Sequence, residues 1–176
     1  MNEIIIELKN NSKTEILAKE TLLEILEEYN LEKWIFTNKV VFEDDCKSHS
    51  HPIITLNTFC NNKKLQLMSV FLHEQIHWFE AGKEKEVKSA INELKEKYPD
   101  IEIISLQNIT KQKAIFSTDL HIIVNYLEYD VLCQIIGKEK AIKIINLRPH
   151  YKWIYSLVLK EEKTIREILE NNGLII

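Results

Sequence analysis

The chain has 176 residues, a formal net charge of −4 and a pI near 5.9, with 45% hydrophobic and 28% charged residues. This length can bury one hydrophobic core, so we expect a single domain spanning residues 1–176. The acidic balance argues against nucleic acid or anionic lipid as partners, because both attract a concentrated basic face. The sequence predicts no membrane span, and its three widely spaced cysteines form no disulfide framework. We therefore expect a cytoplasmic protein that binds neither nucleic acid nor membrane.

The first half of the chain alternates β-type segments with helical ones. Ser12 offers an N-cap for an amphipathic helix. From residue 65 to 81 the apolar side chains recur at steps of three and four, which predicts a helix that ends at Gly82. Segments rich in β-branched and aromatic residues predict three strands, at residues 3–8, 34–42 and 53–59.

The second half predicts helices almost throughout. Pro99 ends a helix that starts near residue 84, and Ser117-Thr118-Asp119 offers an N-cap for a helix from about 120 to 136, which Gly137 ends. Residues 101–116 fit a short strand and a loop. Further helices are expected through residues 153–159 and 164–171. The fold class is therefore α+β and helix-rich: a small N-terminal mixed sheet packs on one helix within residues 1–82, and residues 83–176 form a helical part.

The strongest chemical signal is His73-Glu74-Gln75-Ile76-His77 inside the predicted helix 65–81. Two histidines four residues apart project from one helix face, about 6 Å apart along the axis, so both imidazoles can reach one metal ion. Zinc accepts this geometry, and Glu74 can take a proton from a zinc-bound water without ligating. The alternative is a pair of structural histidines on an amphipathic helix.

This motif resembles the HExxH signature of the zincin metallopeptidases. The preceding order of strand, helix and two strands is also similar to the fold of that family, so the resemblance covers roughly residues 1–82. It implies a zincin-like fold, one zinc ion per chain and a peptide or protein substrate. It also implies that the segment Ile53–Phe59 pairs with extended substrate.

A catalytic zinc needs a third protein ligand and an open fourth position. The metzincin continuation is absent, because the residues that follow His77 contain no third histidine. Asn92-Glu93 is similar to the gluzincin pattern, but Lys97 stands where an acidic residue is expected. His121, Asn125 and Glu128 form a polar stripe beside an apolar helix face, and this stripe is the better source of the ligand.

His121 and Glu128 lie about 10 Å apart along a helix axis, so one is expected to ligate and the other to support. The resemblance to gluzincins favours Glu128 as ligand, with His121 donating a hydrogen bond to the developing oxyanion. The reverse assignment, with His121 as third ligand, stays open. Glu80 could orient an imidazole of the motif. Three further histidines, His49, His51 and His150, are expected in loops.

The sequence therefore predicts a zinc-dependent hydrolase, a metallopeptidase in which Glu74 is the general base. Its expected metal ligands are His73, His77 and Glu128. The alternative function is a regulatory or interaction protein that keeps a zincin-like scaffold and uses any metal for folding. An intact Glu74 favours catalysis, because a structural site does not need it.

Overall fold

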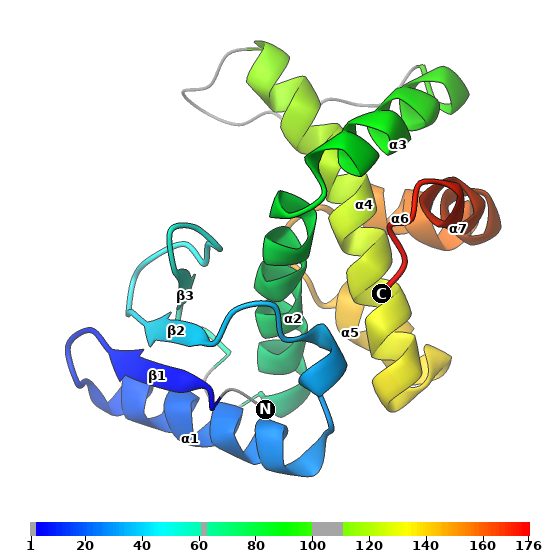
Figure 1. Ribbon diagram of the computed structural model, residues 1–176. Helices are drawn as coiled ribbons and strands as arrows, with labels where there is room; N and C mark the ends of the chain where they lie inside the picture. Colours follow the sequence, from blue (N-terminus) through cyan, green and yellow to red (C-terminus); the bar gives the residue numbers. More distant parts are fainter. Residues whose placement is uncertain (1–2, 61–62, 100–110) are drawn as a thin grey trace.

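The computed structural model describes residues 3–60, 63–99 and 111–176. It has the expected helix-rich α+β architecture, with one short sheet beside a group of helices (Figure 1). In chain order the elements are β1 (Ile5–Leu8), α1 (Lys13–Glu28), the 3-10 helix η1 (Glu32–Trp34), β2 (Lys39–Phe42), β3 (Ile54–Leu56), α2 (Lys64–Ala81), α3 (Glu84–Lys97), α4 (Lys111–Ile136), α5 (Lys138–Asn146), α6 (Lys152–Lys160) and α7 (Glu162–Asn171).

The three strands lie in the order β1-β2-β3, and both neighbouring pairs are parallel. The expectation of a mixed sheet is therefore wrong for the described strands. The reason is the connection: α1 carries the chain back across the sheet between β1 and β2, which is what two parallel neighbours require. Antiparallel pairing is limited to an isolated bridge between His49 and Thr55.

Helix α1 begins where the sequence predicts, at a capping box. The Ser12 hydroxyl accepts a hydrogen bond from the backbone N–H of Glu15, and the Glu15 carboxylate accepts one from the backbone N–H of Ser12. Glu15 is fully buried because its carboxylate also accepts backbone N–H groups from Asn10 and Asp44. The cap thus fastens α1 to the loops that follow β1 and β2.

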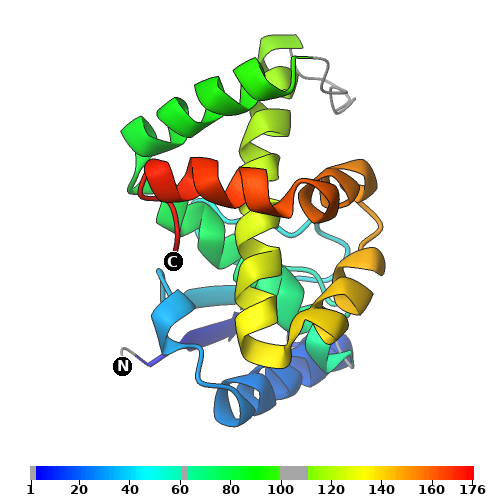
Figure 2. The ribbon, with the colours of Figure 1, turned by 90° about the vertical axis from the view of Figure 1, so that its right-hand side faces the viewer.

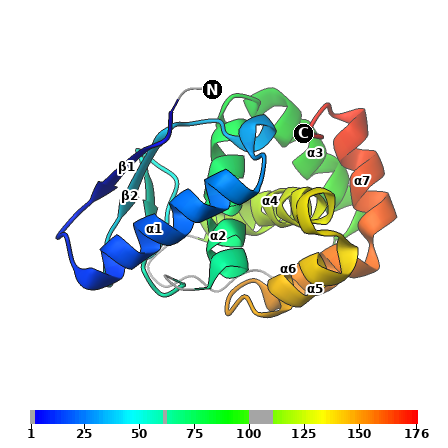
Figure 3. The same ribbon diagram turned by 90° about the horizontal axis from the view of Figure 1, so that it is seen from below.

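Helix α2 is the central element, and it lies between the sheet and α4 (Figure 3). It buries Phe71, Leu72 and Ile76 completely. Gln75, the third residue of the motif, binds the segment before β2: its Oε1 accepts the backbone N–H groups of Phe36 and Thr37 at 2.8 and 3.0 Å. Helix α2 is therefore attached to the segment before β2 through a residue of the motif, not only through apolar packing.

Helix α4 is the long helix that packs against α2, α3, α5, α6 and α7 (Figure 2). It begins at Lys111 in the described part of the chain, so the N-cap predicted at Ser117-Thr118-Asp119 is wrong. Asp119 is instead buried within the helix and pairs with Lys95 of α3 at 3.1 Å. The strand and loop expected at 101–116 fall mainly on residues 101–110, outside the described residues.

The predicted helix end at Gly137 is confirmed, and α3, α6 and α7 match the helices expected from the sequence. Gly137 has a positive φ of 82°, which glycine adopts without strain. Across the described residues, the structure has no helix that combines the length and the apolarity needed to cross a membrane.

Candidate metal centre

Two helices bring three histidines together in the interior. His73 and His77 come from α2 and His121 from α4, and one potential ligand atom of each lies within 4.8 Å of the others. The ring centroids are separated by 5.1 Å for His73 and His77, 5.3 Å for His77 and His121, and 5.7 Å for His73 and His121. The spacing of four in the motif supplies one pair, and the crossing of α2 with α4 supplies the third ring.

Each of these imidazoles has an oxygen beside its Nδ1 atom. Nδ1 of His73 lies 2.8 Å from a carboxylate oxygen of Glu128, and Nδ1 of His121 lies 2.7 Å from the backbone carbonyl of Ser117. Nδ1 of His77 is 3.4 Å from a carboxylate oxygen of Glu80. Oxygen acceptors at Nδ1 favour the tautomer that protonates this atom, which leaves the Nε2 lone pair free for a ligand.

The protein interior keeps these rings neutral. Burial lowers the pKa of His121 to about 3, with the neighbouring His73 and His77 adding to the effect. Burial also lowers the pKa of His77 to about 4 and lowers that of His73, although the Glu128 carboxylate opposes the change in His73. Three neutral imidazoles are the protonation state that a metal ion requires.

Glu128 does not join this cluster as a ligand. Its carboxylate accepts hydrogen bonds from Ser69, His73 and Tyr155, the last at 2.7 Å, and Nε of Arg148 lies 3.8 Å away. Burial disfavours the ionised form, but Arg148 and the hydrogen-bond donors prevail and lower its pKa to about 2. The geometry therefore favours the open alternative, in which His121 is the third ligand and Glu128 supports His73.

Glu74 lies beside the cluster without belonging to it. It is 6% exposed, and burial raises the pKa of its carboxyl group, against the opposing charges of His73 and Arg148. A raised pKa suits a carboxylate that must both accept and release a proton near neutral pH. Position and electrostatics thus agree with the role expected for Glu74.

Three residues of the C-terminal part complete the surroundings, and the sequence reasoning missed them. Arg148 and Tyr155 contact Glu128, while the ring of Tyr151 stacks on His121 with centroids 4.3 Å apart. Tyr151 has a positive φ of 60°, an uncommon conformation for a residue with a side chain. The sequence feature that could have indicated them is the spacing of Tyr151 and Tyr155, which lie one helical turn apart.

The other candidate residues are not members of the histidine cluster. Glu93 accepts a hydrogen bond from Asn172 near the C-terminus. His49 is bonded to the backbone of Lys47 and Thr55, and His150 is exposed. Asn125 is fully buried, and within the described residues its side-chain amide has no hydrogen-bond partner.

The edge of β3 that was expected to pair with extended substrate already forms hydrogen bonds within the protein. Thr55 is the residue of β3 whose backbone faces away from β2, and it exchanges two hydrogen bonds with His49, at 2.8 and 2.9 Å. Substrate could pair with Thr55 only by displacing His49. The structure therefore gives no support to that role for the segment Ile53–Phe59.

Comparisons with known proteins leave the site to be interpreted from its own chemistry. No protein-family model matches the chain, and searches of curated proteins and of solved structures found no match either.

Proposed function

We propose that this protein is a zinc-dependent hydrolase of the metallopeptidase type. One observation carries the proposal: His73 and His121 are buried and His77 is half-buried, their ligand atoms lie within 4.8 Å of one another, burial lowers the pKa of all three, and Glu74 lies beside them. Three histidines with a fourth position left for water are a ligand set that catalytic zinc uses. A zincin-like fold is part of this proposal because the motif helix lies between a small sheet and a second histidine-bearing helix, although the sheet is parallel and not mixed.

The residues around the cluster fit zinc better than they fit a merely structural histidine pair. Each Nδ1 faces an oxygen, as metal-ligating histidines require of their outer shell. Neutral imidazole is a common zinc ligand, and the cluster contains no thiolate that would favour a closed structural site. His73, His77 and His121 would hold the ion, and Glu128 would fix the tautomer of His73.

A zinc ion held by these residues would supply a Lewis acid for the scissile carbonyl and for an attacking water. Glu74 would accept a proton from that water and pass it to the leaving amine. Burial raises the pKa of Glu74, and this brings it closer to the value that such a two-way transfer needs.

His121 cannot serve as the oxyanion donor when it is a ligand, so this role passes to another side chain. Tyr151 stacks on His121 and lies close enough to Glu74 for the Glu74 charge to raise the pKa of the phenol, after the larger effect of burial. A protonated phenol at this position would donate to the developing negative charge on the substrate oxygen.

The test measures zinc content and peptide hydrolysis for wild type and for four variants: His73→Ala, His121→Ala, Glu74→Gln and Tyr151→Phe. We expect one zinc per chain in wild type, Glu74→Gln and Tyr151→Phe, and loss of zinc in both histidine variants. Glu74→Gln should lower kcat by about 10³-fold and Tyr151→Phe by about 10- to 100-fold, because each removes a group that acts on the reacting atoms.

The same panel separates the alternatives. A wild-type protein that takes up no zinc after supplementation contradicts the metal centre. A zinc-bound protein that cleaves no peptide, and whose zinc is unaffected by Glu74→Gln, is the result expected of the non-catalytic regulatory protein.

A further inference from the structure

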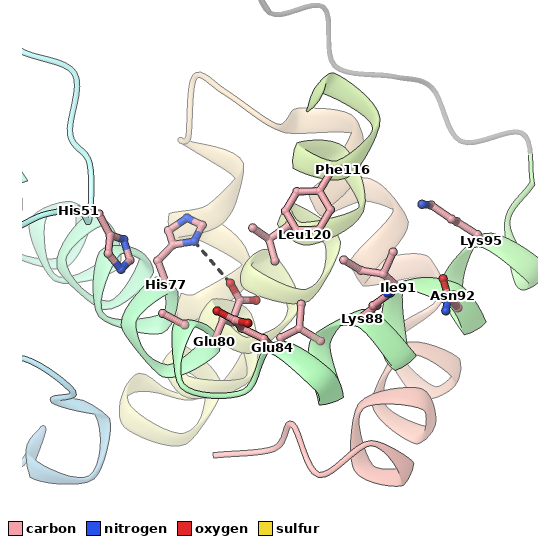
Figure 4. A pocket seen from close by; sticks show the side chains of 12 residues that line it. His51, His77, Glu80, Glu84, Lys88, Ile91, Asn92, Lys95, Phe116 and Leu120 are labelled. Carbon is pink, nitrogen blue, oxygen red and sulfur yellow. Dashed lines mark ion pairs between the residues drawn. The ribbon is translucent and has the colours of Figure 1, made fainter. Parts of the chain in front are cut away.

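A cavity of about 560 Å³ opens beside His77, within the size range of small-molecule and side-chain pockets (Figure 4). It lies between the end of α2, one face of α3 and the part of α4 that precedes His121. Because His77 is part of the wall, the cavity borders the histidine cluster. The lining surface is mostly apolar, and its apolar residues are Ala81, Val87, Ile91, Phe116 and Leu120.

Glu80 places a carboxyl group in this apolar wall. It is 5% exposed, and neither of its oxygens has a hydrogen-bond partner among the described residues. The nearby His77 Nδ1 lies at 3.4 Å from one of them, and Figure 4 shows Glu80 beside His77 and Leu120 in the cavity. A buried carboxyl group that receives no hydrogen bond, with the His77 nitrogen only at 3.4 Å, costs free energy that a ligand with donor groups would recover.

The other charged residues of the wall do not satisfy Glu80. Lys95 forms an ion pair with Asp119 at 3.1 Å. Glu84 and Lys88 line the cavity from α3, and both are exposed. Glu80 is thus the buried acidic group of this cavity. The lysine side chains that line the cavity are exposed to solvent.

We infer that this cavity binds a lysine or arginine side chain of the substrate, with Glu80 accepting hydrogen bonds from its cationic end. The inference rests on the proposed function and names its substrate class. The methylene groups of such a side chain would pack against Val87, Ile91 and Leu120, while the charged end reaches the carboxyl group. One side chain then satisfies both the carboxyl group and the apolar wall of the cavity.

The test uses blocked hexapeptides in which one lysine is moved along an alanine chain, each paired with a peptide that has norleucine at the same position. Norleucine keeps the apolar stem and lacks the ammonium group. Calorimetry on metal-free protein measures binding, and cleavage by the zinc-loaded protein measures turnover. We expect at least one lysine peptide to bind about tenfold or more tightly than its norleucine partner, as a charged hydrogen bond implies.

Glu80→Gln should reduce this preference to less than about twofold, because the amide keeps an acceptor for His77 but loses the charge. Glu84→Gln, the matched change at the exposed carboxylate of the same cavity, should keep the preference. Equal or tighter binding of every norleucine peptide overturns the inference, as does a lysine preference that survives Glu80→Gln. If zinc-loaded protein cleaves neither peptide, the proposed function fails, while the binding of metal-free protein still decides the pocket.

Discussion

Two buried glutamates contact different imidazoles of the cluster, and their surroundings differ sharply. Glu128, which supports His73, receives three hydrogen bonds and lies near Arg148, so its pKa is lowered to about 2. Glu80, beside His77, has no hydrogen-bond partner within the described residues, and burial raises its pKa well above the usual range. The hydrogen-bonding capacity of Glu128 is therefore used within the protein, whereas Glu80 can still accept hydrogen bonds from a ligand.

These surroundings would give the proposed metal centre one rigid side and one side that is open to a ligand. Around Glu128, groups from α2, α4, α6 and the segment before α6 satisfy one another, which fixes the orientation of His73. Around Glu80, the wall is mostly apolar, and neither carboxylate oxygen of Glu80 has a hydrogen-bond partner within the described residues. Substrate recognition is expected where the protein has left its own interactions incomplete.

The same substitution at both sites gives the largest test of this comparison. Glu128→Gln removes the charge that balances buried Arg148, so we expect it to destabilise the metal-free fold by on the order of 3 kcal/mol. Glu80→Gln removes no such balance and should change stability by less than about 1 kcal/mol. Urea unfolding at pH 7 in the presence of a chelator measures both. Equal losses for the two variants would contradict the distinction drawn between them.

Much of the fold could be predicted because it depends on local spacing. The Ser12 cap, the helix around His73 and the helix end at Gly137 each follow from a few neighbouring residues. The candidate ligands His73 and His77 are equally local, since four residues along one helix fix their separation. These predictions needed no knowledge of how the helices pack.

The remaining features depend on packing between distant segments. The sequence predicts that one of His121 and Glu128 ligates a metal and the other supports it, but the choice depends on which turn of α4 crosses α2. That crossing brings His121 to the two motif histidines and sets Glu128 against Ser69. The helix start before Ser117 was missed for a similar reason: Asp119 pairs with α3 instead of capping α4.

Acid should destabilise the metal-free protein through its histidines, and His121→Gln isolates one of them. The pKa of His121 is about 3 in the fold and about 6.5 in the unfolded chain, so below pH 6.5 the unfolded chain binds the extra proton. This effect is absent above pH 7 and grows as the pH falls. Between pH 7 and 5, we expect wild type to lose about 2 kcal/mol more stability than His121→Gln. Parallel losses in the two proteins would show that His121 titrates freely.

Glu80 should act in the opposite direction, and this is the smallest effect we predict. Burial raises the pKa of its carboxyl group, so the folded protein holds a proton at pH values where the unfolded chain has lost it. Stability from this group therefore increases as the pH falls toward about 4.5, the unfolded value, and partly offsets the histidines. Replacing Glu80 with Gln removes that compensation. We expect metal-free Glu80→Gln to lose more stability than wild type between pH 7 and 5 in urea unfolding. A smaller loss in the variant would mean that Glu80 is ionised in the fold and already has a donor, and the side of the centre that is open to a ligand would then have to be placed elsewhere.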